Sequence, residues 1–305
     1  MTEGLLRCSA GGAEFAIRAS EVRHVARADQ LRPDDKRDGR AGVIKLGGYL
    51  VPVFALHARL GLPRTVETPA PDQHIAVTGD QEQLVGWLVD RVTRDSAAAT
   101  VQIAPLPASI GGAARRWFDG IVVTADRSVL LVNTRQLNPL VTDASANIDP
   151  APAFVPLPIS DDPRAEPVAL LFSTAALLAS DTNRYALSAR QVVGIVQPTE
   201  MIVVPGCAPH IAGVTLWRDV VVPVVDFRGQ PHIAPPNSRR LIARCGADGR
   251  QSLVAFSIDA EIVMHKPAAA DRLIPGATCP PFATGVFSVD GDQVALLDLD
   301  ALVAS

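Results

Sequence analysis

The stretch GVTLWRDVVVPV, Gly213–Val224, decides the fold, because the same pattern stands 171 residues earlier as GVIKLGGYLVPV, Gly42–Val53. Each stretch starts on glycine, reaches a pair of polar residues or glycines, and resumes into a run that contains Val-Pro-Val. Short apolar runs bounded by turn residues are typical of β-strands. The two stretches therefore predict the same strand–turn–strand unit at two places in the chain.

Three more blocks repeat in the same order, which indicates an internal duplication. They are Phe15–Ile17 with Tyr185–Leu187, Trp87–Asp90 with Phe256–Asp259, and Gly120–Leu137 with Gly285–Leu302, at offsets of 170, 169 and 165 residues. Chance similarity between apolar runs would not keep this order, and the drifting offset indicates small loop deletions. The sequence thus predicts two copies of one domain, called copy one and copy two below.

A change of composition separates the copies. Residues 146–166 are rich in proline, alanine, serine and aspartate, a mixture that stays extended and resists packing. We expect a linker there, between a first domain at 1–145 and a second at 167–305. The length of 305 residues is also typical of two domains, at roughly 150 residues per domain.

Composition also excludes several classes of protein. With 48% hydrophobic and 20% charged residues, the chain is globular and not disordered. The net charge of −4 disfavours a nucleic-acid partner, which would require clustered basic residues. The closest clusters, Arg115-Arg116 and Arg239-Arg240, are expected to be solvated loop residues.

The expected location is the cytoplasm. Met1–Arg7 lacks the basic start and long apolar run of a signal peptide. The longest charge-free runs are too short, or interrupted by turn residues, for a membrane-spanning helix, so no membrane insertion is expected. The cysteines lie far apart in the sequence, which favours reduced core thiols over a disulfide framework. They are Cys8, Cys207, Cys245 and Cys279.

Local patterns favour an all-β fold of small barrels or sandwiches. Strands are predicted at 49–56, 84–89, 121–125 and 129–132, and the dipeptides Asp248-Gly249 and Asp290-Gly291 predict tight hairpins. Because proline cannot donate a hydrogen bond to a sheet, Pro52 and Pro223 should lie at an edge, a bulge or a strand start. Short helical stretches are expected only at 20–25 and 189–195.

Catalytic patterns are missing from the sequence. A two-lobed aspartic protease would need an Asp-Thr-Gly or Asp-Ser-Gly turn in each copy, and none is present. Cys207 and His210 have ligand-like spacing, but a zinc site needs about four ligands. No phosphate-binding loop or nucleophile elbow occurs. We therefore expect no enzyme activity, cofactor or metal, and a function carried by binding.

The copy-two hairpin and its flanks resemble the motif of a known family. Residues 211–227 read IAGVTLWRDVVVPVVDF and resemble the central motif of the CheW family, I-x-G-x-x-N-L-R-G-x-x-x-P-[IV]-[IV]-D-[LF]. The resemblance implies two tandem CheW-like domains, each made of two small five-stranded SH3-like β-barrels with few short helices. It also implies a non-catalytic adaptor that couples the cytoplasmic tip of chemoreceptors to the regulatory domain of a CheA-type histidine kinase.

The copies depart from the family motif in different ways. Its Arg-Gly pair is Arg218-Asp219 in copy two and Gly47-Gly48 in copy one. We expect unequal copies, with copy two nearer the standard partner geometry. The resemblance suggests eight partner-binding residues: Arg218, Trp217 and Asp219 of the copy-two motif, Lys45 at the motif's Asn position in copy one, and Val22, Val25, Val192 and Ile195 in the receptor-groove region.

Core packing is the other interpretation of the four aliphatic residues and of Trp217. Two further functions stay open at this point. One is a diverged CheW-like scaffold for another two-component output, such as pilus motility or development. The other is a two-lobed β-barrel enzyme.

Overall fold

The computed structural model describes residues 4–34, 39–64, 72–80, 83–94, 101–124, 127–140, 169–173, 184–197, 199–226, 239–246, 252–258, 262–265, 272–273 and 282–304. The predicted linker at 146–166 lies outside these ranges. The chain divides into two compact units. Unit 1 comprises Met1–Leu106, Gly112–Asn147 and Ile202–Cys207, and unit 2 comprises Pro107–Gly111, Ile148–Met201 and Ala208–Ser305.

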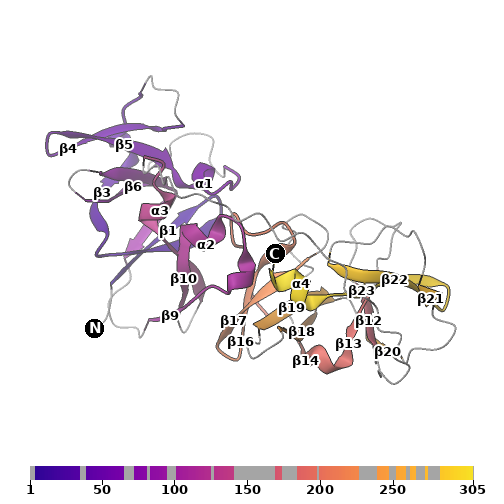
Figure 1. Ribbon diagram of the computed structural model, residues 1–305. Coiled ribbons are helices and arrows are strands. Elements are labelled where there is room, and N and C mark those ends of the chain that lie inside the picture. The colour runs from indigo at the N-terminus through magenta and orange to yellow at the C-terminus, as the bar shows by residue number, and fades with distance from the viewer. Residues whose placement is uncertain are drawn as a thin grey trace. The chain divides into compact units, whose positions relative to one another are not determined.

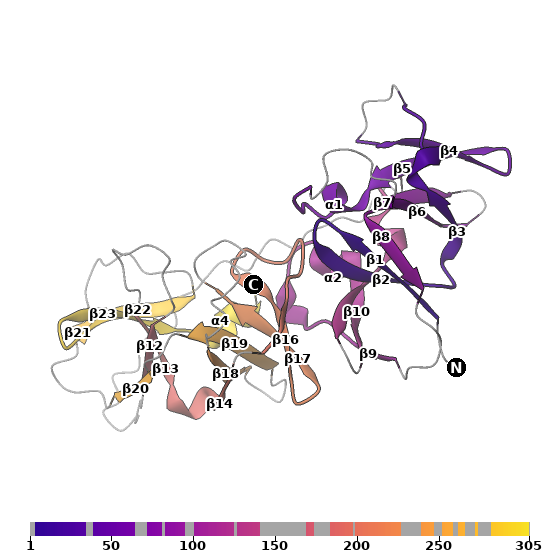
Figure 2. The same ribbon diagram turned by 180° about the vertical axis from the view of Figure 1, so that it is seen from behind.

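Copy one forms two sheets (Figure 1). Their strands are β1 (Leu5–Ala10), β2 (Ala13–Arg18), β3 (Val22–Arg27), β4 (Gly42–Leu46), β5 (Tyr49–Ala55), β6 (His74–Thr78), β7 (Val85–Val89), β8 (Arg91–Arg94), β9 (Gln102–Ala104), β10 (Phe118–Val123) and β11 (Ser128–Val132). One sheet has the order β8-β1-β2-β11-β10-β9, and the other has the order β3-β6-β7-β5-β4. Seen from behind, β8, β1 and β2 lie side by side (Figure 2).

Copy two repeats this arrangement strand for strand. Its strands are β12 (Ala169–Ser173), β13 (Arg184–Ser188), β14 (Val192–Val196), β15 (Met201–Ile202), β16 (Ile211–Trp217), β17 (Val220–Val225), β18 (Arg239–Cys245), β19 (Ser252–Ile258), β20 (Ile262–His265), β21 (Arg272–Leu273), β22 (Ala283–Val289) and β23 (Asp292–Leu297). The sheet orders are β20-β12-β13-β23-β22-β21 and β14-β18-β19-β17-β16-β15. Apart from β15, each strand takes the place of its counterpart in copy one, which confirms the duplication and the all-β fold.

The number of strands per sheet differs from the expected five. Among the described residues, one sheet has five strands and three have six, because short strands such as β9, β15 and β21 extend an edge. Helical segments are short, as expected: α1 (Leu56–Arg59), α2 (Ala114–Trp117), α3 (Thr134–Leu137), α4 (Leu299–Ala304), and the 3-10 turns η1 (Ala28–Gln30), η2 (Ala108–Ile110) and η3 (Ala189–Gln191). None of the helices in the described ranges has the length and apolar character needed to cross a membrane.

Alternation along the strands builds a separate core for each sheet. In the β3–β7 sheet, Ile44, Val51, Val53, Ile75 and Val77 point inward as one buried cluster. In the corresponding sheet of unit 2, Val222, Val224, Ile242 and Ala255 do the same. Residues two apart on a strand share a face, so these apolar runs line one side of each curled sheet.

Both motif prolines occupy unexpected positions. Pro52 and Pro223 lie in the middle of β5 and β17, which are internal strands, so the expectation of an edge, bulge or strand start is wrong. Pro52 stands opposite Val43, whose N–H and C=O both pair with Arg32 at 2.9 and 2.8 Å. Pairing of β5 with β7 begins one residue later, at Val53. Neither neighbouring strand therefore needs an N–H from Pro52 at this point.

Two other local expectations are corrected. The helical stretches predicted at 20–25 and 189–195 are mostly the strands β3 and β14, because their valines and isoleucine pair with β6 and β18. Arg239-Arg240 is not a solvated loop but the start of β18. The Arg240 side chain is buried and donates from Nη1 to Ser257 Oγ at 2.7 Å.

The buried thiol of Cys8 makes stability depend on alkaline pH. Burial raises the pKa of Cys8 from 9.0 to about 12. The folded chain therefore keeps a proton that the unfolded chain loses above pH 9, so the thiol's contribution is complete below pH 9 and falls by about 1.4 kcal/mol per pH unit above it. We expect Cys8→Ala to flatten the fall in unfolding free energy between pH 9 and 10.5, measured by urea titration. Ser9→Ala, on the same strand, should leave the slope unchanged; equal slopes for wild type and Cys8→Ala would contradict the prediction.

Candidate functional site

The turn of the copy-two hairpin has an unusual backbone. Arg218 and Asp219 join β16 to β17 with φ angles of 47° and 64°. Two positive φ angles define a type I′ turn, which glycine or asparagine ordinarily fills. Aspartate tolerates this conformation through its short polar side chain. A long side chain such as arginine is strained there by about 1–2 kcal/mol, and strain of this kind concentrates at functional positions.

Arg218 is held over an aromatic ring. Its Cζ lies 4.6 Å from the centroid of the Trp217 ring, within range of a cation–π interaction. Trp217 is half-buried and packs against the core cluster of this sheet. Arg218, Asp219 and Val220 are exposed. The hairpin therefore presents one cation, fixed on a half-buried indole, beside an apolar side chain.

The copy-one hairpin has the same backbone and different chemistry. Gly47 and Gly48 form its turn with φ angles of 54° and 95°. Lys45 is exposed and stands across the strand from Leu50. Tyr49 and Leu50 are 63% and 68% exposed, far more than an aromatic and an aliphatic side chain usually are. This tip therefore offers apolar surface and no charge on its turn.

The four aliphatic candidates lie on equivalent edge strands. Val22 and Val25 are on β3, and Val192 and Ile195 are on β14. Ile195 is 45% exposed and the other three are half-buried. Both strands carry a bulge after their first residue, which keeps the two pairs at the same positions.

The structure brings β14 and the copy-two hairpin into one sheet and one core. Val193, Val196 and Trp217 all pack against the same buried cluster. The segment after β14 also reaches β16, since the hydroxyls of Thr199 and Thr215 lie 2.6 Å apart. Ile195 and Arg218 are therefore exposed residues of the same curled sheet. Lys45, Val22 and Val25 belong to the equivalent sheet of unit 1.

Reasoning from the sequence missed three exposed apolar residues at the hairpin tips. Tyr49 and Val220 follow the turn dipeptides directly, and Leu50 comes next after Tyr49. The signal was present: the second strand of a type I′ hairpin begins right after the turn, outside the sheet's core, so large apolar residues there are exposed. Family resemblance directed attention to Arg218 and Trp217 instead.

The pKa shifts of His210 and Cys207 have burial as their main cause. Burial lowers the pKa of His210, whose ring lies 4.6 Å from that of Phe282. Burial also raises the pKa of the Cys207 thiol. The His210 ring is thus half-buried against Phe282. Within the described ranges, no three histidine, cysteine or acidic side chains gather as metal ligands.

These features define a class: a tandem all-β protein whose distinctive exposed residues are suited to contact other proteins. Comparison with models of known protein families supports the tandem arrangement. A family model for the CheW-like domain matches residues 4–139 and again residues 175–305. The chain therefore belongs to the CheW family, a family of non-catalytic scaffolds in chemotaxis signal transduction.

Other comparisons add little to this assignment. No curated protein sequence matches the chain. Among solved structures, the scaffolding protein TtCheW from Thermoanaerobacter tengcongensis is similar, with 20% sequence identity over 45% of this chain and 88% of that one, and a TM-score of 0.37.

Proposed function

We propose that the chain is an adaptor that couples chemoreceptors to a CheA-type histidine kinase, with copy two as the arm that binds the kinase regulatory domain. Membership of the CheW family supports the kind of partner. The observation that carries the assignment to copy two is the strained, exposed Arg218 over Trp217. On this proposal the chain works in the cytoplasm, where receptor tips and the kinase meet.

The chemistry of the site favours a partner with an acceptor group. An arginine donates charge-assisted hydrogen bonds to carboxylates or backbone carbonyls, and these are about twice as strong as neutral ones. Because Arg218 is already ordered over the indole ring, binding immobilises less side-chain freedom than it would for a free arginine. Copy one has glycine at the equivalent position, Gly47, and lacks this contact.

Two linked copies would let one molecule bridge two neighbours in an array, because tethering raises the effective concentration of the second module. The proposed boundaries are 1–145 and 167–305, with a linker at 146–166. They are supported by the gap between the two family matches, which end at 139 and resume at 175.

Calorimetric titration of the full chain with the regulatory domain of a CheA kinase from the same organism tests the proposal. We expect one kinase domain per chain, bound through copy two, and weaker binding by Arg218→Ala. Arg244→Ala, which removes another exposed arginine of unit 2, is the matched control and should bind as wild type does. A stoichiometry of two would support coupling and give copy one the same partner. Absence of binding would overturn the coupling role.

A further inference from the structure

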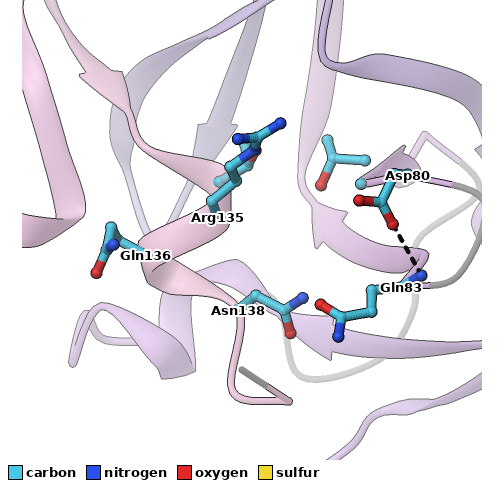
Figure 3. A pocket seen from close by; sticks show the side chains of 8 residues that line it. Asp80, Gln83, Arg135, Gln136 and Asn138 are labelled. Carbon is cyan, nitrogen blue, oxygen red and sulfur yellow. Dashed lines mark hydrogen bonds between the residues drawn. The ribbon is translucent and has the colours of Figure 1, made fainter. Parts of the chain in front are cut away.

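Two hollows open on the surface of unit 1 on either side of one carboxylate. The larger, of about 330 Å³, lies between the β6–β7 turn and α3, and Asp80, Gln83, Arg135 and Asn138 are among its lining residues (Figure 3). The smaller, of about 260 Å³, is lined by Arg23, Tyr49, Leu84 and Asp80. Asp80 lines both hollows, so the two hollows are adjacent.

Charges alternate along this surface. Arg23 lines only the smaller hollow, Arg135 lines only the larger, and Asp80 lies between them. Arg23 is held on the turn because its Nε donates to the carbonyl oxygen of Gly79 at 2.9 Å. Asp80 is ordered by a hydrogen bond from the N–H of Gln83 to its Oδ1, at 3.2 Å. The order along the surface is cation, anion, cation.

The two hollows differ in the polarity of their lining residues. The larger hollow has a polar floor, because Thr78, Thr134 and Asn138 line it and are buried. The smaller hollow has apolar walls from Leu84 and from Tyr49, the exposed tyrosine of the copy-one hairpin. A complementary ligand would therefore place an apolar group beside Tyr49 and charged groups along the line from Arg23 to Arg135.

Among the described residues, copy two does not repeat the cations of this surface at the equivalent positions. Helices α3 and α4 correspond, since each follows a side-chain cap at an equivalent position, Asn133 or Asp298. The counterpart of Arg135 is Asp300, whose Oδ1 accepts a hydrogen bond from the N–H of Gly246 at 2.6 Å. Gly246 directly follows Cys245, where pairing of β18 with β19 ends. In unit 2 the side chain at this position therefore already has a hydrogen-bond donor within the protein.

The remaining counterparts also differ in charge. Strand pairing places Val193 at the position of Arg23, and Ala243 at the position of Thr78. Where the structure describes the counterparts in copy two, neither Arg23 nor Arg135 is repeated as a cation. Because copy two has the same fold without these cations, the fold itself does not require them.

We propose that this surface of copy one docks a polypeptide segment of a partner that presents an acidic, a basic and an acidic side chain in that order, with an apolar side chain against Tyr49 and Leu84. The inference deepens the proposed function, because it gives copy one a partner chemistry different from that of copy two, and it rests on that function only in taking the partner to be a protein. Exposed ion pairs contribute little affinity. The apolar contact supplies attraction, while the charges select the partner and its orientation.

An array of synthetic helical peptides tests the proposal with the full chain. Each peptide carries one leucine and three charged positions, in all eight sign combinations and at several spacings. We expect acid–base–acid peptides to bind at least tenfold more tightly than base–acid–base peptides, with the preference weakening at high salt. The triple variant Arg23→Glu, Asp80→Lys, Arg135→Glu should invert the preference, whereas Arg244→Glu in unit 2 should leave it unchanged.

The outcomes separate this proposal from kinase coupling. Absence of binding by any peptide, or the same preference in wild type and triple variant, would overturn it whatever the kinase titration gives. Because Arg23 also holds the β6–β7 turn, the single variant Arg135→Glu is measured alongside. Arg135 is exposed at the start of α3, so its reversal should cost at least threefold in binding of acid–base–acid peptides without unfolding the domain. An unchanged affinity for Arg135→Glu would also overturn the proposal.

Discussion

Replacement of Trp87 by alanine should lower the free energy of unfolding of unit 1 by about 3–5 kcal/mol. Trp87 is fully buried at the centre of β7, and its Nε1 donates to the hydroxyl of Thr78 at 2.9 Å. Its ring centroid lies 6.4 Å from that of Phe54. The truncation removes a large apolar group, leaves a cavity and deprives the buried Thr78 hydroxyl of its donor, and all three effects destabilise the fold.

Differential scanning calorimetry of the full chain measures this effect, because two units can unfold in separate transitions. We expect the unit 1 transition to move to lower temperature and the unit 2 transition to stay. Leu50→Ala is the matched control: the side chain is 68% exposed, and its removal should change stability by less than about 0.5 kcal/mol. A loss below about 1 kcal/mol for Trp87→Ala would show that the core around it is not close-packed.

Replacement of Arg218 by glycine should separate binding from stability. Loss of a charge-assisted hydrogen bond, worth about 1.5–3 kcal/mol, should weaken binding of the kinase regulatory domain by about 10- to 100-fold. Stability should change by less than about 1 kcal/mol. Relief of the backbone strain at φ 47° is offset by the lost contact with Trp217 and by the greater entropy of unfolded glycine.

Arg218→Ala is the informative companion variant. Alanine keeps the strained backbone and loses the ring contact, so this variant should be less stable than Arg218→Gly and bind equally poorly. Titration calorimetry and urea unfolding on the same samples measure the two quantities. Affinity that follows stability across the two variants would contradict a direct role for the guanidinium group.

Much of the fold was predictable because the duplication doubles every signal. The turn at Asp290-Gly291, with φ angles of 52° and 89°, forms as expected. Strands predicted at 49–56, 84–89 and 129–132 form within one residue of those bounds. The hairpin predicted at Asp248-Gly249 lies outside the described residues. The expectations that failed concern positions decided by tertiary pairing. Pro52 is tolerated inside a sheet because Val43 bonds to Arg32 on its other side and because pairing of β5 with β7 begins only at Val53.

The candidate site was predictable only in part. Family resemblance identified Arg218, but neither its φ angle nor its place over Trp217 can be read from the sequence, since Arg-Asp is an unusual pair for a type I′ turn. The surface around Asp80 combines residues 23, 80 and 135, which are far apart in the chain. The roles of the eight candidate residues stay predictions, and the peptide array and kinase titrations test the two surfaces separately.

The two-residue turns have an evolutionary consequence. Gly47-Gly48 and Arg218-Asp219 adopt the same positive-φ backbone, and all four residues are exposed. Folding therefore constrains the conformation of these positions much more than their identity. After a duplication, one tip can drift toward new specificity while the other preserves the ancestral contact, and neither change endangers the barrel beneath. A single gene can in this way diversify its recognition without first acquiring extra stability.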